Sequence, residues 1–77
     1  VRNALIAAAN SGDARHVPAA KELLQDASPL VRAMAVWAIS ILAETAETDK
    51  LRRTYKPRET DPGVIAEWQR NSSDLTA

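Results

Sequence analysis

Side chains capable of acid–base, nucleophilic or metal chemistry are scarce in this sequence. Its 77 residues include no cysteine and a single histidine, His16. These residues therefore cannot form disulfides or thiolate metal sites, and a zinc site would need carboxylates at spacings that the sequence does not offer. The turn at residues 10–13, Asn-Ser-Gly-Asp, lacks the Gly-Lys-Ser/Thr of a phosphate-binding loop and predicts a connection between helices. We identify no catalytic, cofactor-binding or metal-binding residue, and we expect His16 to face solvent or to cap a helix.

The clearest chemical signal is a basic segment at residues 49–58. Five basic residues stand there against one acidic residue, which gives the segment a net charge of +4, whereas the whole chain is neutral with ten basic and ten acidic residues. A local sign bias of this kind predicts an anion-binding surface, and the alternative is a solvated helix face. Tyr55 is the one aromatic residue of the segment, and its i, i+4 spacing to Leu51 assigns it to the core, so the lysines and arginines favour phosphate contacts over base contacts. The candidate nucleic-acid-binding residues of the segment are Lys50, Arg52, Arg53, Lys56 and Arg58.

Two further arginines, Arg2 and Arg32, each follow a valine at the start of similar apolar stretches. If these stretches are equivalent helices of a repeat, stacking would place the two arginines in a row. Such a row serves either ligand contact or pairing with a nearby acid, for instance Asp13 or Asp26. We include Arg32 among the candidate binding residues, as an outlier of the basic segment.

The element that must organise the fold is the stretch from Asp26 to Leu42. Ser28 is a good N-cap, and Pro29 suits the first helical position. From Leu30 to Leu42 only Arg32 and Ser40 are polar. A surface helix shows one apolar stripe, so this helix should be covered on several sides, and it is too short to span a bilayer.

Four more helices are predicted around this central one. Gly12 ends the first, and Asp13 caps the second, which has Pro18 near its start. The helix predicted after the central one is short and capped by Thr45 or Thr48, with Leu51 and Tyr55 facing the core. Asp61 caps the last helix, Pro62 begins it, and Trp68 turns inward; Trp37 of the central helix is expected to be buried too. The predicted spans are residues 1–9, 13–25, 47–56 and 62 onward.

The sequence repeats itself at a period of about 30 residues. Val1-Arg2 recurs as Val31-Arg32, and Asp61-Pro62-Gly63-Val64 resembles Ser28-Pro29-Leu30-Val31. A period of 30 to 45 residues with two helices each indicates an α-solenoid. We therefore predict an all-α fold of about five helices over residues 1–71, with an amphipathic terminal capping repeat and a frayed tail at 72–77. The face before Val1 is expected to be apolar and to favour self-association.

Three phrases carry a family resemblance: VRNALIAAANSGD at residues 1–13, SPLVRAMAVWA at 28–38 and ETDPGVIAEW at 59–68. They resemble the carboxyl-terminal HEAT-like domain of bacterial epoxyqueuosine reductases. The resemblance implies a full-length oxidoreductase that completes queuosine in tRNA with cobalamin and two four-iron clusters, all held upstream of this domain. The helical domain would support that enzyme and help to hold tRNA, and no catalytic residue carries over to these positions.

The chain also departs from that family at three places. Ala9 stands where glycine is expected, Ser40-Ile41 where Gly-Arg is expected, and Ile65 where arginine is expected. Two functions therefore remain open: a tRNA-positioning domain of an epoxyqueuosine reductase, or a HEAT-like protein-interaction scaffold of an unrelated protein. The sequence shows no signal peptide or membrane segment, and we expect a cytoplasmic protein.

Overall fold

The computed structural model describes residues 2–70, with side chains from Leu5 to Arg70. Within this range the chain is helical and contains no strand, as the all-α prediction requires. The predicted tail at 72–77 lies outside the described residues. Five α-helices and two short 3-10 helices follow one another in the order α1 Arg2–Ser11, η1 Ala14–His16, α2 Val17–Leu23, α3 Pro29–Leu42, α4 Thr45–Tyr55, η2 Lys56–Arg58 and α5 Pro62–Arg70.

Side-chain caps fix the starts of α3 and α5, as predicted. The hydroxyl of Ser28 accepts a hydrogen bond from the backbone N–H of Val31 at 3.4 Å. The carboxylate of Asp61 accepts from the N–H groups of Gly63 and Val64 at 2.9 and 3.2 Å. Each cap satisfies amides of the first turn that have no partner within the helix.

The connection between α1 and α2 also follows its residue types. Gly12 has a φ of +68°, in the left-handed region that favours glycine. Asp13 then accepts a hydrogen bond from the N–H of Arg15 at 2.9 Å and caps η1. Pro18 lies in the first turn of α2, so the regular helix begins at Val17.

The start of α4 differs from the prediction. Glu44 is its N-cap residue and makes no side-chain cap. Because the helix begins at Thr45, Thr48 falls inside it and cannot cap it. Thr48 is instead 7% exposed, and its hydroxyl has no hydrogen-bond partner within the described structure. The prediction that Thr45 or Thr48 caps this helix was therefore wrong.

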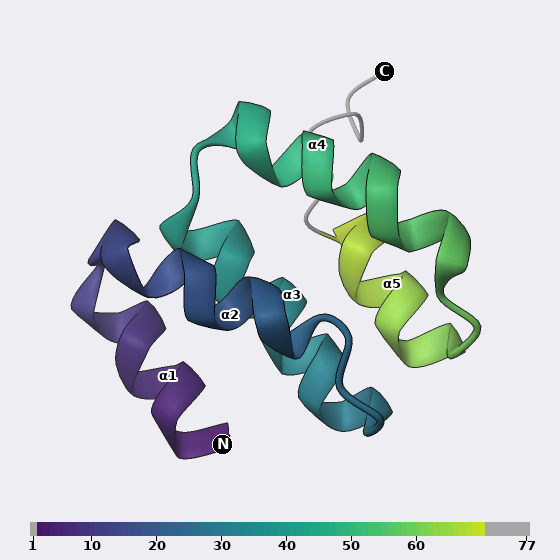
Figure 1. Cartoon of the computed structure of the whole chain (residues 1–77), viewed down its shortest axis with the longest axis horizontal. Coiled ribbons are helices and arrows are strands. Elements are labelled where there is room, and N and C mark those ends of the chain that lie inside the picture. The colour runs from purple at the N-terminus through teal and green to yellow at the C-terminus, as the bar shows by residue number, and fades with distance from the viewer. Residues whose placement is uncertain (1, 71–77) are drawn as a thin grey trace.

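Helix α3 is the centre of the molecule (Figure 1). It packs against α1 and α5 on its flanks, against α2 across it, and against α4 near its end. Helices α1, α3 and α5 thus form one layer, and α2 and α4 form the other. Four residues of α3 are completely buried: Ala35, Val36, Ala38 and Ile39.

The core extends from α3 into the neighbouring helices. Trp68 of α5 is only 1% exposed, as predicted, and Leu51 of α4 joins the same cluster. Trp37, which was predicted to be buried, packs against this core but is only partly buried. No helix within residues 2–70 has the length and apolar content needed to cross a bilayer.

Candidate interaction surfaces

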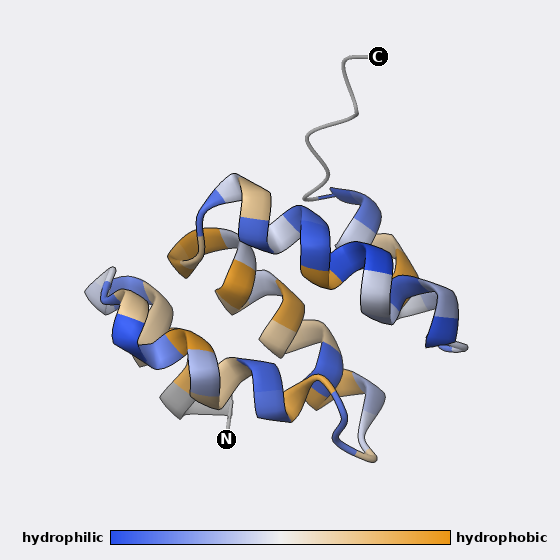
Figure 2. Ribbon diagram, turned by 45° about the horizontal axis from the view of Figure 1, so that its top comes forward, coloured by the Kyte–Doolittle hydropathy of each residue, from blue (hydrophilic) through white to orange (hydrophobic). Residues whose placement is uncertain are grey.

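The basic segment divides into side chains that face solvent and side chains that do not. Lys50 and Arg53 are exposed on α4, and Arg58 is exposed on η2. Lys56 is half-buried. Since Lys50 and Arg53 are three residues apart on one helix, they lie on neighbouring positions of its surface. The mostly hydrophilic colouring of α4 in Figure 2 shows this polar face.

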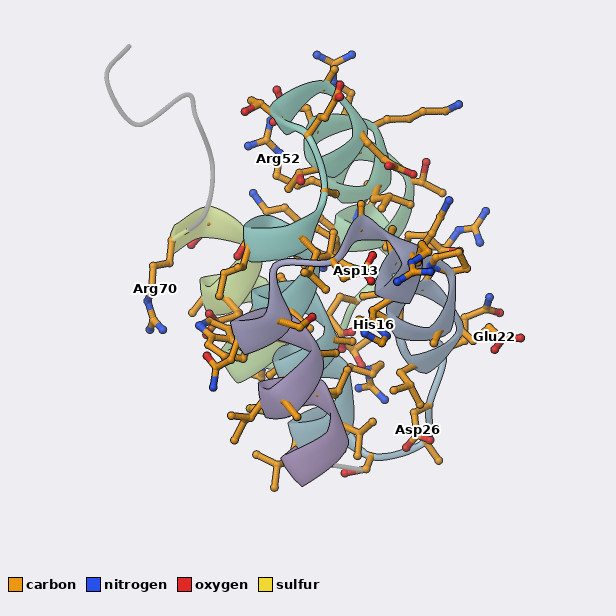
Figure 3. All side chains as sticks on the ribbon, turned by 90° about the vertical axis from the view of Figure 1, so that its left-hand side faces the viewer. Asp13, His16, Glu22, Asp26, Arg52 and Arg70 are labelled. Carbon is orange, nitrogen blue, oxygen red and sulfur yellow. The ribbon has the colours of Figure 1, made fainter. Side chains whose placement is uncertain are left out.

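Arg52 was predicted to contact nucleic acid with these residues, but it points inward. It is 9% exposed, and its guanidinium lies 3.2 Å from the carboxylate of Asp49. Figure 3 labels Arg52 beside α4. A guanidinium in this position stabilises the helix and its packing, and it is poorly placed for a phosphate.

Arg32 is held in a network that joins α3 to the loop before α5. Its Nε and Nη2 donate to the two carboxylate oxygens of Glu59 at 2.8 and 2.9 Å. Its Nη1 donates to the backbone carbonyls of Asp26 and Ala27 at 2.8 and 3.2 Å. The Arg32 and Glu59 side chains are only 17% and 8% exposed. A bidentate, largely buried pair of this kind holds the loop before α5 against α3, and it leaves little of the guanidinium open to a ligand.

This pair changes the titration of both groups. The hydrogen bonds from Arg32 hold the pKa of Glu59 below its ordinary value, although burial of the carboxylate acts in the opposite direction. The N–H groups of Asp61 and Thr60 also donate to this carboxylate and lower the pKa further. The hydrogen bonds between the two side chains raise the pKa of Arg32. Glu59 is therefore ionised at neutral pH and remains so well into the acid range.

Arg32 stood out in the sequence, but its partner did not. We expected an acid of the adjacent turn, such as Asp26, whereas the carboxylate comes from Glu59, 27 residues away. The carboxylate of Asp26 instead accepts from the N–H of Ser28 at 2.9 Å. Asp13 pairs with Arg15, Nη2 to Oδ2 at 2.7 Å, and the Arg2 side chain lies outside the described residues. Arg32 and Glu59 are too far apart in the sequence for a local pattern to pair them, and only the fold brings them together.

A cavity of about 330 Å³ lies beside this pair, between the end of α2 and the helices α4 and α5. Arg58 lines it together with Arg32, so the structure brings these two candidates to one place. Asp26 and Glu59 line it as well, which balances the positive charge. The cavity is therefore near neutral and is not an evident anion site.

The outer face of α3 carries an apolar stripe, which we call the α3 stripe. Leu30 and Ile41 are 61% and 49% exposed, the two large hydrophobic side chains most open to solvent among the described residues. Between them, at helical spacing, lie the partly buried Met34 and Trp37. A helix face turned to water is ordinarily polar. Exposed apolar patches of this kind mark interaction sites in soluble domains.

Helices α1, α3 and α5 lie side by side, α2 packs across α3, and α4 contacts α3; this order corresponds to the helix pairs α2–α3 and α4–α5, with α1 in the place of the second helix of an earlier pair (Figure 1). A family model described as HEAT repeats matches residues 2–66. The chain belongs to the HEAT-repeat family. Neither the curated proteins nor the solved structures gave a match. The HEAT-like part of the predicted resemblance is thus confirmed.

This HEAT-repeat domain offers no thiolate ligand for the iron–sulfur clusters that the reductase resemblance implies. It has no cysteine, so it cannot supply the thiolates that hold a four-iron cluster. Within the described part of the chain, no three His, Asp or Glu side chains come together to hold a metal ion. The thiolates of such a cluster would have to come from other parts of a longer protein.

Proposed function

We propose that this HEAT-repeat domain is a non-catalytic interaction scaffold that binds a protein partner on the α3 stripe. The observation that carries the proposal is the exposure of Leu30 and Ile41 on the central helix of the fold. Both belong to a helix whose opposite face forms the core, so their apolar character is not needed for packing. Anchoring side chains in protein interfaces are commonly large and apolar or aromatic, and Trp37 lies between the two.

Substitution of the exposed ends of the stripe tests this function. The double variant Leu30→Ser/Ile41→Ser should keep the fold, because both side chains are largely solvated, and should lose its protein partner in affinity capture from its source cells. The matched control, Lys50→Ser/Arg53→Ser, changes two exposed residues on α4 and should retain the partner. Circular dichroism checks that both variants are folded. Equal retention by both variants would contradict the proposal.

A second, finer function is supported by the basic segment and by the three phrases shared with epoxyqueuosine reductases. In this proposal the domain belongs to a cytoplasmic reductase that uses cobalamin and two four-iron clusters, and it positions tRNA. Lys50, Arg53 and Arg58 are exposed, and no ion pair links them to another residue between 5 and 70. They are free to contact phosphates, whereas Arg32 and Arg52 would first have to leave their carboxylate partners.

Charge reversal in the full-length protein tests this second function. Lys50→Glu/Arg53→Glu/Arg58→Glu should weaken tRNA binding and should lower the slope of log affinity against log salt by somewhat under one unit per lost phosphate contact. Reversal of Arg15, which is exposed on the opposite end of the stack, is the control and should leave the slope unchanged. A triple variant with parental affinity and slope would show that the segment is a solvated face.

A further inference from the structure

The cavity of about 330 Å³ beside the Arg32–Glu59 pair lies between two helix pairs, α2–α3 and α4–α5, that both belong to the described residues. It is bordered by the α2–α3 connection at residues 24–28 and by the α4–α5 connection at residues 56–61. Figure 1 shows both connections on the right-hand side of the stack. Small-molecule sites in proteins have volumes of about 300 to 1,000 Å³, so this cavity has room for a small ligand.

One wall of the cavity is apolar. It is formed by Leu24 at the end of α2, by Val64 and Trp68 of α5, and by Tyr55 at the end of α4. Leu24, Val64 and Trp68 also belong to the buried core, and Tyr55 packs against that core. Close packing behind the wall keeps its shape fixed, and an apolar wall of this kind suits the hydrocarbon or aromatic body of a ligand.

The Arg32–Glu59 pair holds the polar rim of the cavity in place. The carboxylate of Glu59 accepts four hydrogen bonds, two from Arg32 and one from each backbone N–H of the next two residues. Arg32 also donates to the carbonyls of Asp26 and Ala27, so one side chain ties both connections to α3. Because the rim is ordered by these contacts without a ligand, binding costs less conformational entropy. The two charges of the pair cancel and leave other groups to meet a ligand.

Two charged side chains of the lining have no ionic partner. Asp26 and Arg58 belong to the two different connections, and neither takes part in an ion pair with another residue between 5 and 70. One carboxylate oxygen of Asp26 accepts from the N–H of Ser28, which leaves the other oxygen open to a donor. Gln25 and Thr60 add uncharged polar side chains to the same lining. The cavity therefore presents one open anion, one open cation and an apolar wall.

We propose that this cavity binds a small zwitterion with an apolar body, of the amino-acid or dipeptide class. The ammonium of the ligand pairs with the carboxylate of Asp26, its carboxylate accepts from the guanidinium of Arg58, and its side chain lies on the apolar wall. A ligand of a single charge leaves one of these two groups unpaired, whereas a zwitterion pairs both. The cavity shares no residue with the α3 stripe, and it shares only Arg58 with the tRNA proposal, so the three proposals can fail separately.

The test is a titration of the isotope-labelled 77-residue chain with leucyl-leucine and, separately, with phenylalanine, followed in two-dimensional NMR spectra. Saturable shifts should appear at the indole N–H of Trp68 and at the backbone amides of Arg58 and Thr60, which line the cavity. The indole of Trp37, on the α3 stripe, should not shift. For a ligand of this size we expect a dissociation constant of about 1 mM or lower. The ligand that binds more tightly identifies the class as dipeptide or amino acid.

Two analogues and two variants test the charge pairing. N-acetyl-leucyl-leucine lacks the ammonium and leucyl-leucinamide lacks the carboxylate, so each should bind roughly three- to tenfold more weakly than leucyl-leucine. Asp26→Asn keeps an acceptor oxygen for Ser28. It should weaken leucyl-leucine by a similar factor and leave the acetylated analogue unchanged. Arg58→Gln should weaken leucyl-leucine and leave the amide analogue unchanged. Arg15→Gln is the control outside the cavity and should alter none of these affinities.

Three results would overturn the proposal. The first is that neither zwitterion gives saturable shifts below about 10 mM, or that the shifts gather at Trp37 and spare Trp68. The second is that both analogues bind as tightly as leucyl-leucine, or that Asp26→Asn and Arg58→Gln weaken all ligands equally. The third is that inorganic phosphate shifts the same signals at lower concentration than either zwitterion, because the cavity would then be an anion site.

Discussion

At the scale of single residues, the contact that defines the fold most sharply is the pair between Arg32 and Glu59. It closes the loop before α5 onto the start of α3 through two hydrogen bonds, and Glu59 also accepts from the N–H groups of Thr60 and Asp61. Arg32 meets two carbonyls at the end of the α2–α3 connection as well. One guanidinium thus joins the α2–α3 connection and the start of α3 to the loop before α5, which lies 27 residues further along the chain.

Glu59→Gln should lower the melting temperature at pH 7 by roughly 5–10 °C, because it removes the charge that balances a largely buried guanidinium. Arg32 keeps the pKa of Glu59 below its ordinary value of 4.5, so the stability from this group is present above that pH and is lost as pH falls through the lower, folded-state value. The difference between parent and variant should therefore be constant from pH 7 to about 5 and should shrink towards pH 3.

Thermal melts of the two proteins across this pH range measure the effect. Glu47→Gln is the control, since its pair with Lys21 is about 40% exposed on both sides and should change the melting temperature little. The lowered pKa of Asp13 contributes equally to parent and variant, so it cancels in the comparison. A difference that stays the same down to pH 3 would refute the assignment.

At the scale of elements, helix starts were predictable where a capping residue and a proline coincide. Ser28-Pro29 and Asp61-Pro62 begin α3 and α5 as expected, and Gly12 ends α1 as expected. The start of α4 was not predictable in this way. Its first residues offer two threonines as caps, but neither serves, because packing against α3 sets where the helix begins and carries Thr48 into the core.

Thr48→Val should stabilise the domain by about 1 kcal/mol, because it replaces a buried hydroxyl without a partner by a methyl group of similar size. Val17 already occupies the corresponding buried position of α2. Urea unfolding monitored by circular dichroism measures the change. Thr54→Val is the control, since that exposed hydroxyl donates to the carbonyl of Lys50 at 3.0 Å and gains nothing from removal. A loss of stability in Thr48→Val would contradict the conclusion that the Thr48 hydroxyl is buried without a hydrogen-bond partner.

At the scale of the whole molecule, the composition and the 30-residue period were enough to predict a stacked helical fold. The apolar stretch from residue 30 to residue 42 correctly indicated a helix covered on several sides. It did not reveal that one side stays open, because Leu30 and Ile41 look like core residues in the sequence. Only the arrangement of α1 and α5 beside α3 shows which face is left uncovered.

The candidate binding residues were predictable as a charged segment but not as individual contacts. Charge counting cannot distinguish two adjacent arginines that differ in the structure. Arg53 faces solvent, whereas Arg52 pairs with Asp49. The distinction depends on the rotation of α4 about its own axis, and this is set by burial of Leu51. The apolar character of the first helix was predictable, whereas the apolar groove that Leu5 and Ala8 of this helix form with α2, with His16 in its lining, emerges only from the packed helices.

The central claim is that the open face of α3 binds a protein. The most direct test places a photo-crosslinking amino acid at position 30, 41 or 53 of the protein in its own cells and identifies the adducts after irradiation. We expect a discrete protein adduct from positions 30 and 41, and none of that protein from position 53 on α4. RNA adducts from position 53, with no protein adduct from either position on α3, would contradict it.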